Sequence, residues 1–93
     1  MMIGIFPKSP PDQTDYDIDF SEWLPDGDTI TSADATVEPD GELAVASVSI
    51  TDQTVKVWLN GGLDGETYTV TLIVGTAGGR TKEICFKIRV KEC

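Results

Sequence analysis

The sequence contains no histidine among its 93 residues and has only two cysteines. Without histidine, the chain lacks the base that activates Ser-His-Asp and Cys-His nucleophiles, and it lacks the commonest zinc ligand. Two of its carboxylates could in principle act as a glycosidase pair, but a domain of this size offers little cleft in which to raise one pKa. We therefore expect neither an enzyme nor a cofactor.

Basic residues are scarce and unevenly placed. The chain has sixteen acids and seven bases, and residues 1–46 hold eleven of the acids with a single base, Lys8. Phosphate neutralisation needs clustered Lys and Arg, so we expect no nucleic-acid partner, and an anionic membrane surface is disfavoured for the same reason. The acidic half is either a solvated surface or a face that meets a basic partner.

Long apolar runs are also missing. No segment is long enough to span a membrane, and the first residues do not have the pattern of a signal peptide. Cys85 and Cys93 fall in one final strand and its tail, where eight extended residues span about 26 Å. The Cα atoms of a disulfide lie only about 4.4–6.8 Å apart. We expect free thiols, which fit a reducing cytosol better than secretion.

Alternation of apolar and polar residues is the main pattern that is present. Six segments alternate in this way, turns rich in Gly, Pro and Asp separate them, and no helical period is visible. The spacing predicts one all-β domain, an antiparallel immunoglobulin or fibronectin-III-like sandwich of about six or seven strands. The expected strands cover residues 15–20, 29–37, 43–50, 55–59, 68–74 and 84–90, and the third places Ala44, Ala46, Val48 and Ile50 on one wall.

In residues 1–14, apolar and polar residues do not alternate. Pro7, Pro10 and Pro11 cannot donate to a sheet ladder. We therefore expect residues 1–14 to form a proline-rich arm and residues 15–93 to form the sandwich. The arm is expected to order on a neighbour during assembly, and a short seventh strand would come either from it or from residues near Trp23.

One octapeptide carries a more specific signal. Leu63, Gly65 and Tyr68 are spaced as in a tyrosine corner, in which the phenol at the start of a strand hydrogen-bonds the backbone of the preceding turn. This device is typical of Greek-key sandwiches. We interpret all three residues as architectural.

Two tryptophans are candidates for an interface. If Val55, Val57 and Leu59 point inward, Trp58 points outward, where it is either an interface anchor or covered by a loop of the same chain. Trp23 lies where the alternation breaks, so the pattern does not predict the direction of its side chain. We expect it to plug one end of the sandwich.

Charged residues line two predicted strand walls. Asp15, Asp17 and Asp19 resemble the opening of a calcium loop, but Phe20 replaces its glycine, so we expect a solvated acidic wall and no metal site. Lys87 and Arg89 share the outward wall of the last strand with Glu83, Cys85 and Lys91, and together they form a short basic stripe. This stripe is either solvated or faces the acidic wall, within one molecule or between copies.

Several segments together resemble a family of small phage and prophage proteins, the fiber–tail adaptors, which have an immunoglobulin-like sandwich. The resemblance implies a non-enzymatic virion protein, present in several copies, that links tail and fiber proteins and is made in the host cytoplasm. A carbohydrate-binding module with Trp58 as a stacking platform, and a capsid decoration protein, are the alternatives. The matching segments are Asp15–Leu24, Asp28–Ile30, Val57–Gly62, Gly65–Val70, Thr76–Thr81 and Ile88–Val90.

Overall fold

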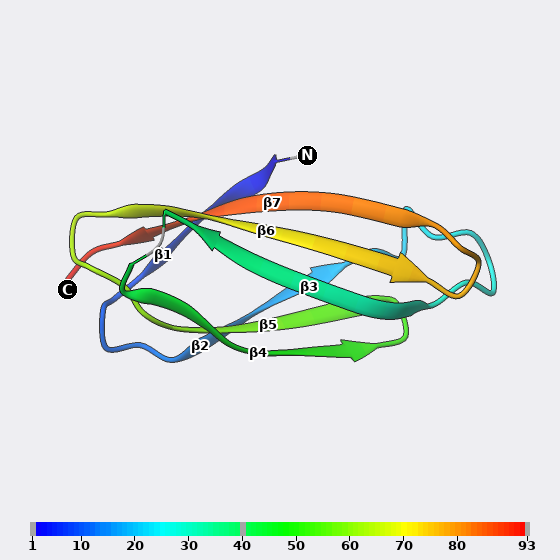
Figure 1. Cartoon of the computed structure of the whole chain (residues 1–93), viewed down its shortest axis with the longest axis horizontal. Coiled ribbons are helices and arrows are strands. Elements are labelled where there is room, and N and C mark those ends of the chain that lie inside the picture. The colour runs from blue at the N-terminus through cyan, green and yellow to red at the C-terminus, as the bar shows by residue number, and fades with distance from the viewer. Residues whose placement is uncertain (1, 40, 93) are drawn as a thin grey trace.

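The computed structural model describes residues 2–39 and 41–92, and this part of the chain forms two packed sheets of strands (Figure 1). The predicted all-β sandwich is confirmed, and its strands number seven in the described residues. Their bounds are β1 (Met2–Lys8), β2 (Thr14–Asp19), β3 (Ile30–Glu38), β4 (Leu43–Thr51), β5 (Thr54–Gly61), β6 (Thr67–Thr76) and β7 (Thr81–Val90).

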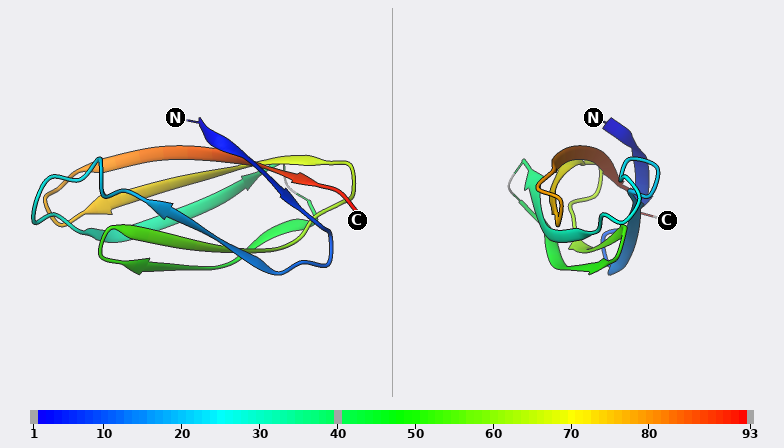
Figure 2. Two further views of the ribbon diagram at one scale, coloured as in Figure 1. Left: turned by 180° about the vertical axis from the view of Figure 1, so that it is seen from behind. Right: turned by 90° about the vertical axis from the view of Figure 1, so that its right-hand side faces the viewer.

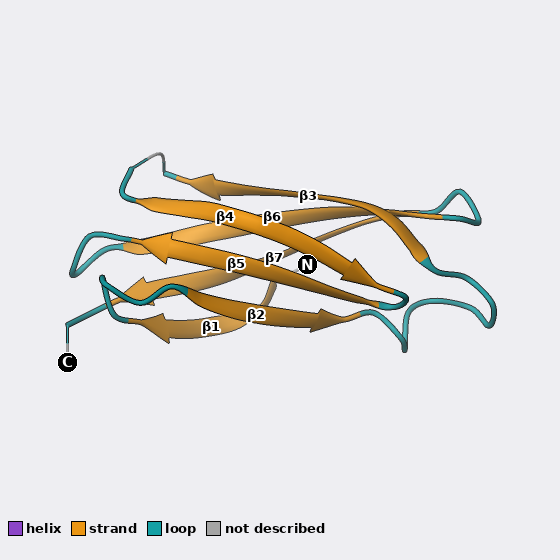
Figure 3. Cartoon of the chain, turned by 90° about the horizontal axis from the view of Figure 1, so that it is seen from below, coloured by secondary structure: helices purple, strands orange, loops and turns teal. Residues whose placement is uncertain are grey.

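One sheet has the strand order β1-β7-β6-β3 and the other has the order β2-β5-β4. All paired strands are antiparallel except β1 and β7, which run parallel. The second sheet matches the B, E and D strands of an immunoglobulin constant-type domain, and β3, β6 and β7 match C, F and G. The body is elongated, 42 × 20 × 20 Å, so the loops gather at two well separated ends (Figures 2 and 3).

The core lies between the two sheets and comes mainly from β5, β6 and β7. These strands alternate without interruption, so every second side chain points inward. Full burial of an aliphatic or aromatic side chain contributes about 1.5–3 kcal/mol. The fully buried side chains are Val55, Val57, Leu59, Val70, Leu72, Val74, Ile84, Phe86, Ile88 and Val90.

The structure differs from the arm predicted for residues 1–14, because Met2–Lys8 are a strand of the sandwich. β1 lies along the Cys85–Val90 part of β7, and this segment supplies the seventh strand. Pro7 is tolerated there because an edge strand has one unpaired side. Phe6 reaches inward to Phe86, with ring centroids 5.8 Å apart.

A buried cation holds the end of β1 in place. The side chain of Lys8 is nearly inaccessible to solvent, and its ammonium group donates to the backbone oxygens of Ser9, Pro10 and Gly61. Burial lowers the pKa of Lys8, and the nearby Asp12 carboxylate opposes that shift. The one base of the acidic half is therefore a structural cation and not a surface charge.

A shift in register changes the phase of β4. Its pairing with β5 is irregular between Val45 and Ser47, so Ala46 is an extra, exposed residue. A bulge of this kind moves the following side chains to the opposite face. The predicted wall that contained both Ala44 and Ala46 is therefore wrong: Leu43, Val45 and Val48 face the core, and Ala44 is exposed.

Candidate docking surfaces

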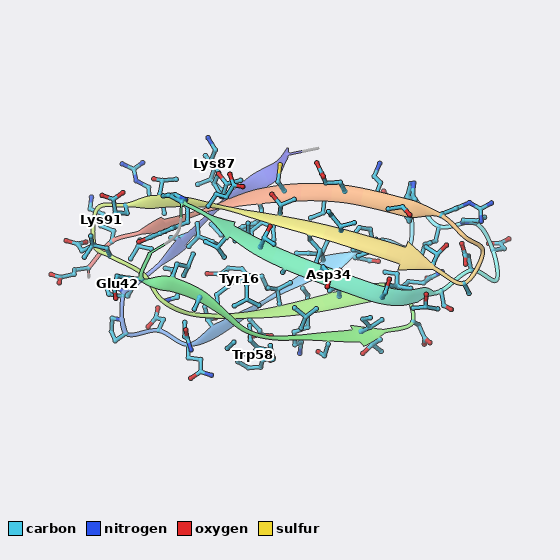
Figure 4. All side chains as sticks on the ribbon, viewed as in Figure 1. Tyr16, Asp34, Glu42, Trp58, Lys87 and Lys91 are labelled. Carbon is cyan, nitrogen blue, oxygen red and sulfur yellow. The ribbon has the colours of Figure 1, made fainter. Side chains whose placement is uncertain are left out.

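Trp58 lies on the outer face of the β2-β5-β4 sheet. It is in the central strand, between Asp15 of β2 and Ser47 of β4, and its side chain is half-buried. Figure 4 shows the ring projecting away from the core. An aromatic side chain at the middle of an outer sheet face is the kind of residue that anchors protein interfaces.

The acidic residues of β2 share this outer face. Asp15 and Asp17 flank the amine of Lys56, with N–O distances of 3.5 and 4.0 Å. The ion pairs are solvent-exposed, so each contributes only about 0–1 kcal/mol. Asp19 accepts the Ser21 backbone N–H at 2.8 Å, and the hydrogen bonds from Ser21 lower the pKa of its carboxyl. Within residues 2–39 and 41–92, no three potential metal ligands converge.

The basic stripe lies on the other side of the sandwich. Lys87 is on the outer face of the β1-β7-β6-β3 sheet, opposite to Trp58 (Figure 4), and Arg89 is exposed on the same face of β7. The stripe therefore cannot face the acidic wall within one molecule, so that alternative is wrong. Sequence reasoning missed Lys56 as the intramolecular partner of the acids because it did not set β5 beside β2.

The thiol of Cys85 is free on the same strand face as Lys87. Cys93, the other predicted free thiol, lies outside the described residues.

Trp23 lies in the turn that follows β2. The turn forms because the backbone N–H groups of Trp23 and Leu24 both donate to the Phe20 carbonyl, each at 3.0 Å. The Trp23 ring packs edge-on against Phe20, and the amine of Lys82 lies 5.7 Å from the Trp23 ring centroid. The half-buried ring forms one wall of a groove of about 350 Å³ between β2 and β7.

A buried carboxylate joins two loops at the same end of the molecule as this turn. Asp28, only 6% exposed, accepts the Gly78 backbone N–H at 2.9 Å and pairs with the Arg80 guanidinium at 3.1 Å. Burial by itself raises the pKa of Asp28, but hydrogen bonds from Gly78, Thr76, Thr29 and Arg80 outweigh it, so the pKa lies below its usual value.

Sequence reasoning missed this Asp28–Arg80 clamp. Asp28 looked like a turn residue, and Gly78 to Arg80 looked like an independent hairpin loop. An added Cβ at Gly78 would lie 2.6 Å from the Arg80 guanidinium and 3.0 Å from the Asp28 carboxylate, so a side chain there would crowd the pair. Both segments occur among the matching pieces of the family resemblance, which was the one available signal.

The tyrosine corner lies at the other end of the molecule. Tyr68 is buried, and its hydroxyl oxygen accepts the Leu63 backbone N–H at 3.1 Å. Gly65 supplies the positive φ of 87° that this turn requires. These residues hold a turn closed and leave no reactive group exposed, which matches the architectural interpretation of Leu63, Gly65 and Tyr68.

The described part of the chain has no helix with the length and apolarity that crossing a membrane requires. The fold defines an immunoglobulin-like sandwich module. Over residues 8–89, the chain matches the family described as Podophage GP4 fiber-tail adaptor protein gp77. The chain therefore belongs to this family, as the resemblance implied, and the family is one of virion proteins.

No curated protein is significantly similar to the chain. Among solved structures, a crystal structure of the 2,6-sialyltransferase of Photobacterium sp. JT-ISH-224, with CMP and lactose bound, is similar with a TM-score of 0.52 and 11% sequence identity. The similarity covers 98% of this chain and 18% of that one. At this identity, the likeness concerns the fold alone.

Proposed function

We propose that this chain links tail and fiber proteins in a podophage virion through protein–protein contacts, without catalysing a reaction. The family membership supports the adaptor role. The single structural observation that carries the proposal is the half-exposed Trp58 at the centre of the β2-β5-β4 outer face. Several copies would be present in each particle, after synthesis and assembly in the host cytoplasm.

The outer face around Trp58 has the features of a docking patch. The central ring is apolar, while Asp15, Asp17 and Lys56 around it are charged and solvated. Interfaces commonly combine an aromatic centre with a polar rim, and the charges at the rim fix orientation and speed association. The rigid sheet beneath positions the ring, because Val57 and Leu59 on either side of it are fully buried.

Particle assembly tests this role. Phage carrying Trp58→Ala should assemble particles with fewer fibers, because truncation of an interface anchor costs about 2 kcal/mol or more of binding free energy. Electron microscopy of purified particles measures the number of attached fibers. Ile73→Ala is the matched control, since Ile73 is a 42% exposed apolar residue on the opposite outer face. Full fiber attachment in phage that lack the gene would contradict the adaptor role.

Carbohydrate stacking is the competing use of the Trp58 ring. Quenching of tryptophan fluorescence by sugars, lost in Trp58→Ala and kept in Trp23→Ala, would favour that function instead. Immunogold labelling of the head would favour a capsid decoration role.

A further inference from the structure

One edge of β7 is covered along only part of its length. β1 pairs with β7 from Cys85 to Val90, and the pairing stops there. Among the described residues, no strand lies beside Thr81–Ile84 on that side. An uncovered strand edge offers unpaired backbone groups to any extended segment that can reach it.

The hydrogen bonds at both ends of β7 show which residues turn toward β6. The Thr76 backbone N–H donates to the Arg80 carbonyl, and the Val90 backbone N–H donates to the Glu66 carbonyl. The pairing of β6 with β7 has no register shift between these points. The even-numbered residues of β7 therefore direct their backbone groups toward β6.

The odd-numbered residues face the other way. Just past the end of β7, the Lys91 backbone N–H donates to the Lys8 carbonyl at the end of β1. Since backbone groups alternate in direction along a strand, those of Thr81 and Glu83 point to the uncovered edge. Two residues of β7 therefore present donors and acceptors there.

The groove beside Trp23 lies next to this part of β7, since Lys82 and Ile84 are among the residues that line it. Its volume is about 350 Å³, and the buried side chains of Ile18, Phe20 and Ile84 form its floor. Trp23 and Lys82 form one wall. An added strand would place every second side chain over this apolar floor. Three acidic residues, Asp17, Asp19 and Glu22, are among the residues that line it.

We propose that an extended segment of another virion protein, with apolar residues alternating with Lys or Arg, adds as a strand to β7 at Thr81–Ile84. This inference rests on the proposed adaptor function and names the way in which one partner is held. The residues that line the groove include three acids, Asp17, Asp19 and Glu22, and one base, Lys82, and this charge balance favours a basic segment. Backbone hydrogen bonds to Thr81 and Glu83 would hold the segment, and the groove would select its apolar residues.

The test uses the full-length chain and an array of short overlapping peptides that cover the tail and fiber proteins of the same virus. Bound peptides should alternate apolar and basic residues. Glu83→Pro removes one outward N–H and is tolerable at an uncovered edge, so it should weaken peptide binding about tenfold. Glu83→Ala keeps that N–H and should stay within about twofold of the parent.

A charge variant tests the same site without touching the backbone. Glu22→Lys in the lining of the groove should weaken binding of the basic peptides several-fold, more at low salt than at high salt. Asp34→Lys is the matched control, because Asp34 is an exposed acid on the outer face of β3, away from the groove (Figure 4). Equal weakening by both variants would overturn the proposal, since only bulk charge would then matter.

Two further outcomes separate this proposal from the adaptor function. If whole tail or fiber proteins bind the chain but no peptide does, or if Glu83→Pro binds as well as Glu83→Ala, strand addition at β7 is overturned and the adaptor function stands. If neither whole proteins nor peptides bind, both are overturned.

Discussion

The two ends of the sandwich are closed by different chemistry. At one end, the Tyr68 phenol and the buried Lys8 amine bind backbone groups of the turns. At the other end, the buried Asp28 carboxylate holds the β6–β7 loop through Gly78 and Arg80. The first end closes on itself, while the second keeps two loops rigid and leaves a groove open beside them. A scaffold can thus be rigid at both ends and offer space for a partner at only one.

The largest expected effect in this comparison is at the tyrosine-corner end. Gly61→Ala should lower the free energy of unfolding by about 3 kcal/mol or more, because it combines a positive φ with overpacking. Gly61 has a φ of 76°, and an added Cβ would collide with the Glu42 carbonyl oxygen. Denaturant unfolding measures the loss.

Gly65→Ala is the control for the collision. Gly65 also has a positive φ, 87°, but no atom lies within 4 Å of an added Cβ. Gly65→Ala should therefore lower the free energy of unfolding by only about 1 kcal/mol. Equal losses for the two variants would show that the collision at Gly61 is relieved by a shift of the turn.

The next effect concerns the phenol itself. Tyr68→Phe removes the acceptor of the Leu63 N–H and should cost about 1–2 kcal/mol of unfolding free energy, because a partly buried hydrogen bond is lost. Tyr16→Phe is the control: its hydroxyl donates to the Pro7 carbonyl in a longer, solvent-exposed bond of 3.3 Å, and it should lose less. A loss within experimental error for Tyr68→Phe would mean that the corner does not stabilise this end.

The smallest expected effect is at the opposite end, and it depends on pH. Asp28→Asn keeps an oxygen that can accept the Gly78 N–H, but it removes the charge and replaces the oxygen that accepts from Arg80 with an NH2 donor. Because the folded-state pKa of Asp28 is depressed, its stabilisation is fully present above the unfolded pKa of about 3.9 and is lost as pH falls through the lower folded value.

Thermal unfolding of parent and Asp28→Asn between neutral pH and pH 2 measures this dependence. The gap between the two midpoints should be constant near neutrality and should shrink below about pH 4. A gap that stays constant into acid would show that the Asp28–Arg80 pair contributes by shape and not by charge.

Local sequence patterns predicted much of the fold. The alternation in Val55–Leu59, Val70–Val74 and Ile84–Val90 predicted three core strands and their inward faces, because side-chain direction in a strand has a period of two. The same rule predicted that Trp58 points outward. These features depend on neighbouring residues only, so sequence is sufficient to find them.

The missed features all depend on residues that are distant in sequence. β1 is stabilised by β7, more than seventy residues later, and its own Pro7 argues against a strand. The extra residue in β4 becomes visible only in its register with β5. Asp28 and Arg80 are 52 residues apart, so neither segment by itself indicates the other.

The amino-acid sequence by itself determined an all-β domain, its core strands and the turn around Tyr68, because these follow from local periodicity and backbone preferences. It also carried the segments that identify the adaptor family. Only the tertiary structure decided that the acidic and basic walls lie on opposite faces and that part of the β7 edge stays uncovered beside a groove. Those features arise from how strands pair and layers pack, and pairing between distant residues leaves no trace in the local pattern of either partner.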